Sequence, residues 1–389
     1  MILVITAKRI TGLQYHRQIV PFKFLENDFK IEYRESEEGL TEEYLKNFTI
    51  ISFLREIYGD VNWYKQLGLK IHFDIDDYWV LPSHHQLAKP YKENKYAEKT
   101  IAAITAADFV TTTTDYLAER IRKFNPNVYV LPNAIDSKEE QWVSNNTFDS
   151  SRYVSTSTGA IEYNYSIVKS DKRLKFGYIA GAHHVRDVEM LYPELLKLYR
   201  DHTIKNKWQL LTAGFNWNKD EAGRISANVY YRYVEQCFTN GYKELDLQYA
   251  QILASEKPMV FENVDEPYMR LNGKDINNYG KLYDQIDVAL VPLINTEFNR
   301  NKSQLKIIEA GFKKKACMVS NVIPYVFDIT SDNAIICNDG DWHKSIKYLI
   351  NNPSKVTELQ EAMYDYVKSK YEIRIVTINR KQLFEHYGN

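Results

Sequence analysis

The chain has 389 residues, of which 44% are apolar and 26% are charged, which is the balance of a globular protein. This length favours two domains over one. With 50 Lys and Arg against 51 Asp and Glu, the net charge of −1 argues against a protein that binds nucleic acid mainly by charge.

Short β-branched segments alternate with helical segments in the first part of the chain. After a turn at Gly12, the apolar residues Ile19, Phe22 and Leu25 fall on one face of a helix. Such alternation predicts a parallel sheet with helices on both faces. The expected strands are Ile2–Thr6, Phe29–Tyr33, Phe48–Phe53, Leu69–Ile75, Asp108–Thr113 and Val128–Leu131, and the expected helices are Tyr15–Leu25 and Lys92–Ala106.

A polar, turn-rich stretch from Asp136 to Lys172 interrupts this pattern and predicts a linker or a long excursion. The alternation then restarts, so we predict an α/β protein with two Rossmann-like, doubly wound domains. Open sheets bind ligands at the carboxyl ends of their strands, which places the expected site in a central cleft that the two domains face. The expected elements are strands at Leu174–Ile179, Trp208–Thr212, Pro258–Phe261, Asp287–Val291, Ala316–Ser320 and Ala334–Cys337, and helices at Arg186–Asp201, Lys302–Phe312 and from Trp342 onward; the long stretch Asn228–Asn278 is expected to shape a pocket.

The second half opens with a strand, a small-residue turn and the start of a helix. Gly181 lets backbone N–H groups approach a ligand closely, and the helix that follows favours an anion. His183 and His184 lie on this turn, where either could donate to a phosphate or a sugar. Because no Gly-x-Gly-x-x-Gly pattern is present, a dinucleotide is not expected, and an ordinary strand-to-helix turn remains the alternative.

The densest polar cluster runs from Asn299 to Glu309. Ser303 is a residue type that suits a helix N-cap, and Lys302 beside it would meet a phosphate where the helix dipole is positive. Glu309 lies among apolar residues of the same helix and therefore needs a partner. Two hydroxyls of a ribose would satisfy it. The alternative is a solvated amphipathic helix.

Asp74, Asp76 and Asp77 crowd the end of the fourth strand. Like charges this close need water, a cation or a donor-rich ligand, and Asp74-x-Asp76 matches the short pattern that holds a divalent ion against a nucleotide diphosphate. Tyr78 and Trp79 come next and would offer aromatic faces to a hydroxyl-rich acceptor. Trp79 suits a core position equally well.

Tyr15 and Arg17 follow the first strand and should face the same cleft, with an exposed surface arginine as the alternative. The segment from Val130 to Asp136 resembles the PNG(I/V)D segment that closes the N-terminal domain of GT-B glycosyltransferases of the retaining GT4 group. Phe298–Glu309, with Ser320–Pro324 after the next strand, resembles the donor-site helix and loop of that group. Phe176–Asp187 is similar to its phosphate turn in a bacterial and phage subgroup, which also carries a Tyr/His-Arg pair near the N-terminus and an acidic strand end like Ile75–Trp79.

This resemblance implies a GT-B fold. Residues 1–165 would bind the acceptor, a final helix at 372–389 would cross back onto that domain, and residues 166–371 would bind the nucleotide-sugar. In the family a glutamate at the place of Glu309 holds the ribose, whereas the preceding family glutamate is replaced here by Asn301. The implied site comprises Asp76, Asp77 and His184 as catalytic residues, Gly181, His183, Arg186, Asn299, Asn301, Lys302, Ser303 and Glu309 for the donor, and Tyr15, Arg17, Tyr78 and Trp79 for the acceptor.

The predicted activity is transfer of a sugar from a UDP- or GDP-sugar to a hydroxyl of a glycan, lipid-linked or other acceptor, with retention and without a metal ion. Positive charge and helix N-termini can stabilise the diphosphate leaving group. The alternatives are a metal-dependent transferase that uses Asp74 and Asp76, a nucleotide-sugar-binding protein without turnover, and a phage DNA-modifying glycosyltransferase. Residues 1–150 carry 18 basic against 22 acidic residues, which disfavours nucleic acid as acceptor.

The cellular location follows from the cysteines and the hydropathy. Cys237, Cys317 and Cys337 are too few for a disulfide framework and lack the spacing of a metal site, which favours a reducing cytoplasm. No apolar run reaches the roughly 18 residues of a membrane-spanning helix. We therefore expect a cytoplasmic protein, with room for a peripheral contact at the inner face of the membrane.

Overall fold

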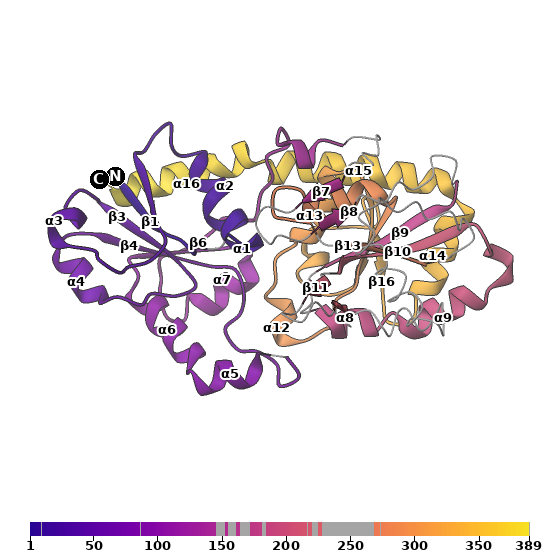
Figure 1. Cartoon of the computed structure of the whole chain (residues 1–389), viewed down its shortest axis with the longest axis horizontal. Coiled ribbons are helices and arrows are strands. Elements are labelled where there is room, and N and C mark those ends of the chain that lie inside the picture. The colour runs from indigo at the N-terminus through magenta and orange to yellow at the C-terminus, as the bar shows by residue number, and fades with distance from the viewer. Residues whose placement is uncertain are drawn as a thin grey trace. The chain divides into compact units, whose positions relative to one another are not determined.

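The computed structural model describes residues 1–8, 10–85, 87–144, 152–154, 161–163, 172–180, 184–215, 217–219, 225–227, 268–272 and 274–388. The chain forms two compact units, each built on a six-stranded sheet (Figure 1). Unit 1 comprises Met1–Ser137, Asn295–Ile308 and Ser369–Asn389, and unit 2 comprises Lys138–Ile294 and Glu309–Lys368.

The sheet of unit 1 is entirely parallel, in the order β2-β1-β3-β4-β5-β6. Its direction of growth reverses between β1 and β3, which is the switch point where doubly wound sheets bind ligands. All six predicted strands are confirmed to within two residues at each end. They are β1 (Ile2–Ile5), β2 (Ile31–Arg34), β3 (Ile50–Leu54), β4 (Lys70–Ile75), β5 (Phe109–Thr112) and β6 (Val128–Val130).

Two predicted helices of unit 1 differ from the expectation. The first begins at Gly12, which therefore opens the helix rather than a turn before it, and it contains a π-helical segment. The second is divided at Lys95, whose left-handed backbone (φ 53°) ends one helix and starts the next. The elements are α1 (Gly12–Gln14), η1 (Tyr15–Ile19), α2 (Val20–Lys23), α3 (Glu42–Leu45), α4 (Val61–Gln66), α5 (Ala88–Glu93), α6 (Tyr96–Ala106), α7 (Asp115–Ile121), α12 (Glu297–Arg300) and α16 (Ile373–Gly388).

The C-terminal helix α16 packs on the sheet of unit 1 beside α2 (Figure 1). Phe384 is fully buried there, with its ring centroid 5.4 Å from that of Phe22 and 4.9 Å from that of His72. Tyr387 stacks on Phe109 at 4.1 Å. The last residues of the chain thus complete the core under the first strands.

Unit 2 repeats the architecture with a parallel sheet in the order β13-β10-β9-β14-β15-β16. Two further two-stranded sheets pair β7 with β8 and β11 with β12. The strands are β7 (Arg152–Val154), β8 (Ile161–Tyr163), β9 (Leu174–Ile179), β10 (Trp208–Phe215), β11 (Trp217–Lys219), β12 (Ile225–Ala227), β13 (Tyr268–Asn272), β14 (Val288–Val291), β15 (Ala316–Ser320) and β16 (Ile335–Cys337).

Two predicted helices of unit 2 also differ from the expectation. The predicted helix Arg186–Asp201 is divided, because Pro193 favours the first turn of a new helix. The helix predicted from Lys302 begins at Leu305 instead. The helices are α8 (Val185–Glu189), α9 (Tyr192–Arg200), η2 (Glu140–Trp142), η4 (His202–Ile204), η6 (Tyr279–Gln285), α13 (Leu305–Phe312), η7 (Tyr325–Phe327), α14 (Trp342–Asn351) and α15 (Pro353–Tyr371), of which α13 and α15 each have residues in both units.

Strands β9 and β15 occur with the predicted bounds, and the predicted fold class, α/β with two doubly wound units, is confirmed. Strand β13 was not predicted. The strand expected at Pro258–Phe261 lies outside the described residues, as does most of Asn228–Asn278. In the described part of the chain, no helix is both long enough and apolar enough to cross a membrane.

Gly177 lies in β9, at the centre of the second sheet, directly against Ile286. A Cβ added at Gly177 would lie 2.7 Å from Cδ1 and 2.9 Å from Cβ of Ile286. We expect Gly177→Ala to lower the free energy of unfolding by about 1–3 kcal/mol through overpacking, measured by urea denaturation. Gly388→Ala, where the nearest atom is 3.6 Å away, is the control; equal stability of the two variants would contradict this packing.

Candidate functional site

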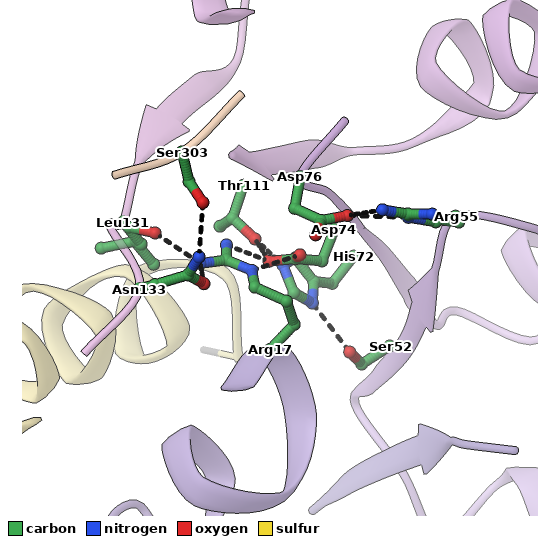
Figure 2. A network of polar contacts seen from close by, with 10 residues as sticks. All are labelled: Arg17, Ser52, Arg55, His72, Asp74, Asp76, Thr111, Leu131, Asn133 and Ser303. Carbon is green, nitrogen blue, oxygen red and sulfur yellow. Dashed lines mark hydrogen bonds and ion pairs between the residues drawn. The ribbon is translucent and has the colours of Figure 1, made fainter. Parts of the chain in front are cut away.

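A buried ion pair joins the first helical segment to the end of β4 (Figure 2). Arg17 donates from Nε to Oδ1 of Asp74 at 2.8 Å and from Nη2 to Oδ2 at 2.7 Å. Arg17 Nη1 donates to the carbonyl of Leu131 at 2.8 Å and to Oδ1 of Asn133 at 3.3 Å, where the chain leaves β6. Burial by itself would raise the pKa of Asp74, but the charge and hydrogen bonds of Arg17 outweigh it and hold that pKa below its usual value.

A hydrogen-bonded chain continues from Asp74 into the core. The Thr111 hydroxyl donates to Asp74 Oδ2, so its oxygen accepts from Nε2 of His72, which lies 2.8 Å away. Nδ1 of His72 is then the acceptor for the Ser52 hydroxyl, also at 2.8 Å. His72 is wholly buried, and burial lowers its pKa to about 3 despite the attraction of Asp74. The imidazole is therefore neutral over the physiological pH range.

The other two acids of this cluster are held by Arg55, which follows β3. Its Nε donates to Asp76 Oδ1 at 2.7 Å and its Nη2 to Asp77 Oδ2 at 2.6 Å (Figure 2 draws the pair with Asp76). Lys302 Nζ lies 3.8 Å from Asp77 Oδ1. The sequence analysis did not find Arg55. The sequence signal for Arg55 was its position directly after β3. This strand neighbours β4, and the carboxyl ends of parallel strands lie at the same edge of a sheet.

The predicted donor residues near α12 lie in unit 1. Lys302 sits over the Phe298 ring at 4.6 Å, and the Ser303 hydroxyl accepts from Asn133 Nδ2 at 2.9 Å (Figure 2). Because α13 begins at Leu305, Ser303 lies before the helix rather than in the expected N-cap position. Asn299 and Asn301 are also buried, and Asn301 Nδ2 donates to the carbonyl of Glu297 at 2.7 Å.

The predicted acceptor residues differ in exposure. Arg17 is 1% exposed, which rules out the alternative of a free surface arginine. Tyr15 and Trp79 are each 5% exposed, and Trp79 packs edge-on against Phe124, which favours its core role. Tyr78 is half-buried beside Trp79, at 4.9 Å between ring centroids.

In unit 2, His184 and Asp187 form a close pair. His184 Nδ1 lies 2.8 Å from Asp187 Oδ2, and the second oxygen of Asp187 accepts from the backbone N–H of Ile294 at 2.9 Å. An ionised Asp187 fixes the imidazole with its proton on Nδ1. Arg186 lies on α8 with its side chain 62% exposed, paired with Glu189. The predicted residues Gly181 and His183 lie outside the described residues.

Glu309 has the partners that its burial requires. The Tyr279 hydroxyl donates to Oε1 at 2.6 Å, and the Tyr283 hydroxyl donates to Oε2 at 2.8 Å. Glu309 is 6% exposed. Neither tyrosine was found by the sequence analysis, because both follow the long stretch up to Asn278 and belong to no motif.

No three His, Cys, Asp or Glu side chains among the described residues are grouped so that they could hold a metal ion. The acids of the DxD pattern are in separate ion pairs, Asp74 with Arg17 and Asp76 with Arg55. A metal bound by this pattern would have to displace two guanidinium groups.

No family model and no curated protein sequence matches the chain. Among solved structures, sucrose-phosphate synthase from Thermosynechococcus elongatus is similar with a TM-score of 0.63 at 12% identity, over 99% of this chain and 98% of that one. HepE from Anabaena in complex with UDP is similar with a TM-score of 0.58 at 10% identity, over 99% of both chains. A UDP-forming trehalose-phosphate synthase from Burkholderia xenovorans has a TM-score of 0.55 at 12% identity, over 91% of this chain and 76% of that one.

These similar proteins are GT-B glycosyltransferases, and the GT-B fold predicted from the sequence is confirmed. At such identities the likeness establishes the fold alone, so the function must be argued from the residues of this chain.

The neutral His72 makes stability depend on pH. Its pKa of about 3 in the folded chain lies below the usual 6.5, so between these values only the unfolded chain takes up the proton and stability falls as the pH falls. We expect the free energy of unfolding to drop by about 2 kcal/mol more in the wild type than in His72→Gln between about pH 7.5 and 5. Denaturant titrations at both pH values measure this, with the exposed His202→Gln as the control; a wild-type pH dependence in His72→Gln would contradict it.

Proposed function

We propose that this protein is a glycosyltransferase that moves a sugar from a nucleotide-sugar to a hydroxyl of its acceptor. The observation that carries the proposal is Glu309, a buried carboxylate whose two oxygens are each oriented by a tyrosine hydroxyl. It stands where the sequence resembles the ribose-binding glutamate of the family. The GT-B fold supports the same function, because HepE of that fold has been solved with UDP-glucose.

The donor would be bound mainly through hydrogen bonds and positive charge. Glu309, oriented by the two tyrosine hydroxyls, is the residue proposed to accept from hydroxyls of the donor's ribose. Lys302 and Arg186 are the residues proposed to neutralise the diphosphate. Lys302 would do so with its ammonium group. Arg186 would do so with its guanidinium group, from the helix that follows the predicted phosphate turn. Asn299 or Asn301 would contact the donor sugar through its side-chain amide in place of the missing glutamate.

Catalysis would consist of stabilising the charges that develop as the bond from the sugar to the diphosphate breaks. The departing phosphate itself would remove the proton from the acceptor hydroxyl on the same face, which gives retention. His184, held by Asp187, would donate to a sugar or phosphate oxygen. Asp76 and Asp77 would accept from hydroxyls of the acceptor.

We propose that the reaction needs no metal ion. Asp74 is engaged with Arg17 and Thr111, and Asp76 with Arg55, so each acid of the Asp74-x-Asp76 pattern already has a guanidinium partner. A glycan, a lipid-linked sugar or another hydroxylated molecule is the proposed acceptor. The acidic balance of residues 1–150 disfavours DNA in that role.

Donor binding tests the proposal directly. We expect the sugars of one nucleotide among UDP-, GDP-, ADP- and CMP-sugars to raise the melting temperature of the protein. A ligand that binds only the folded state stabilises that state. Glu309→Ala and Lys302→Ala should each lower the affinity for that ligand about tenfold or more. Glu361→Ala and Lys314→Ala, which break an exposed ion pair, are the matched controls.

Wild-type donor affinity in both site variants would refute the assignment of the donor residues. Incubation of the binding donor with candidate acceptors then separates a transferase from a binding protein without turnover, which would release no nucleoside diphosphate. Activity in EDTA is the expected result; activity that is lost in EDTA and restored by Mg²⁺ or Mn²⁺ would favour the metal-dependent alternative.

Replacement of Asp187 tests the proposed role of His184. Asp187→Asn keeps an oxygen for the Ile294 N–H but removes the charge that orients the imidazole. We expect kcat to fall about tenfold to a hundredfold, with donor affinity changed much less. Steady-state kinetics across pH measure this, and an unchanged kcat would remove His184 from the mechanism.

A further inference from the structure

Arg380 is a buried cation on the C-terminal helix α16. The residue is 1% exposed, and none of its three guanidinium nitrogens has a hydrogen-bond partner among the described residues. A guanidinium group carries five N–H donors and a positive charge, and in a protein core both need a partner. Arg17, which is buried to the same extent, has such partners in the carboxylate of Asp74 and the carbonyl of Leu131.

The charged groups that act on Arg380 do not balance its charge. Asp74 attracts the guanidinium, but Asp74 already accepts two hydrogen bonds from Arg17, and the charge of Arg17 repels Arg380. Burial and this repulsion lower the pKa of Arg380 to about 9 in spite of Asp74, so the group remains charged at neutral pH. His72, on which the charge of Arg380 also acts, is neutral there. These four side chains therefore carry two positive charges and one negative charge.

The face of α16 that carries Arg380 offers one further polar group. Thr377 lies one turn before Arg380 on that face, and its buried hydroxyl has no partner within the described part of the chain. Phe384 lies one turn after Arg380 and is fully buried against Phe22 and His72, where α16 packs beside α2 (Figure 1). The unpaired nitrogens and the unpaired hydroxyl thus share a helix face that is packed on the sheet of unit 1 and shielded from bulk water.

We propose that Arg380 binds a small monovalent anion of the chloride type inside unit 1, with Thr377 donating its hydroxyl to the same anion. An anion supplies the balancing charge and accepts N–H and O–H donors from several directions. A water molecule would accept hydrogen bonds but would leave the charge unbalanced. A monovalent ion fits better than a phosphate dianion, because Arg17, the second cation of this region, is already paired with Asp74.

This inference is independent of the proposed glycosyl transfer, and its consequence is a stability that depends on halide. The anion would offset the repulsion between Arg380 and Arg17 and so hold α16 on the first sheet. An anion that binds only the folded chain should raise the folding equilibrium constant about tenfold for each tenfold increase in its free concentration above the dissociation constant.

Unfolding in urea tests the proposal when chloride replaces gluconate at constant ionic strength, so that general screening of charges does not change. We expect chloride and bromide each to raise the free energy of unfolding along this mass-action curve. Inorganic phosphate at the same ionic strength should not act through Arg380. A wild type with the same free energy of unfolding in chloride and in gluconate overturns the proposal, as does a wild type that phosphate alone stabilises.

Three variants locate the effect. Arg380→Met removes the charge while keeping an unbranched side chain, and its stability should not respond to chloride. Thr377→Val should lower the affinity for chloride about threefold to tenfold. Arg374→Met is the matched control, because Arg374 lies on the same helix with its side chain 40% exposed and paired with Asp136 and Glu372.

Arg374→Met should keep the wild-type dependence on chloride. A response to chloride that persists in Arg380→Met, or that is lost in Arg374→Met, overturns the assignment to Arg380. An unchanged affinity in Thr377→Val removes Thr377 from the site.

A direct measurement on the wild type decides the question if Arg380→Met does not fold. Crystals grown with bromide in place of chloride should show anomalous scattering from a bromide ion within hydrogen-bonding distance of the Arg380 guanidinium. Bromide at the surface of the molecule alone, with water at the guanidinium, is the result that contradicts a buried anion site.

Discussion

The buried pair of Arg17 and Asp74 is the interaction on which the carboxyl edge of the first sheet depends. Removing two charges from water is expensive, and their attraction compensates only where the remaining polar atoms are also satisfied. Arg17 meets this condition with four hydrogen bonds from its three nitrogens, two to Asp74 and one each to Leu131 and Asn133, and Asp74 accepts from Thr111 as well. One ion pair therefore fixes the segment after β1, the end of β4 and the exit of β6 together.

The charges of Arg17 and Asp74 act on the pKa values of the neighbouring Arg380 and His72. Arg380 on α16 is 1% exposed, and burial together with the positive charge of Arg17 lowers its pKa to about 9, against the attraction of Asp74. It therefore stays charged at neutral pH. His72, by contrast, is neutral because burial disfavours the imidazolium, and the neutral ring can both donate to Thr111 and accept from Ser52. The C-terminal helix thus contributes a cation to the same buried region that its Phe384 closes with apolar packing.

The two units orient their carboxylates by different means. In unit 1 the acids Asp74 and Asp76 are paired with guanidinium groups, which orient them. In unit 2 Glu309 is held by two phenolic hydroxyls. Both arrangements fix the orientation of a carboxylate, the first through charged donors and the second through neutral ones.

The sequence by itself determined the alternation of strands and helices, because burial on both faces of a parallel sheet leaves short, mainly apolar runs such as β14 and β15. It also showed that Glu309 must have a partner. Only the tertiary structure decided which partners: Arg55 and Tyr283 belong to no motif and lie 21 and 26 residues from the carboxylates they hold. Ion pairs and hydrogen bonds depend on which strand ends and helices meet in space, and that is a property of the folded chain that local patterns do not contain.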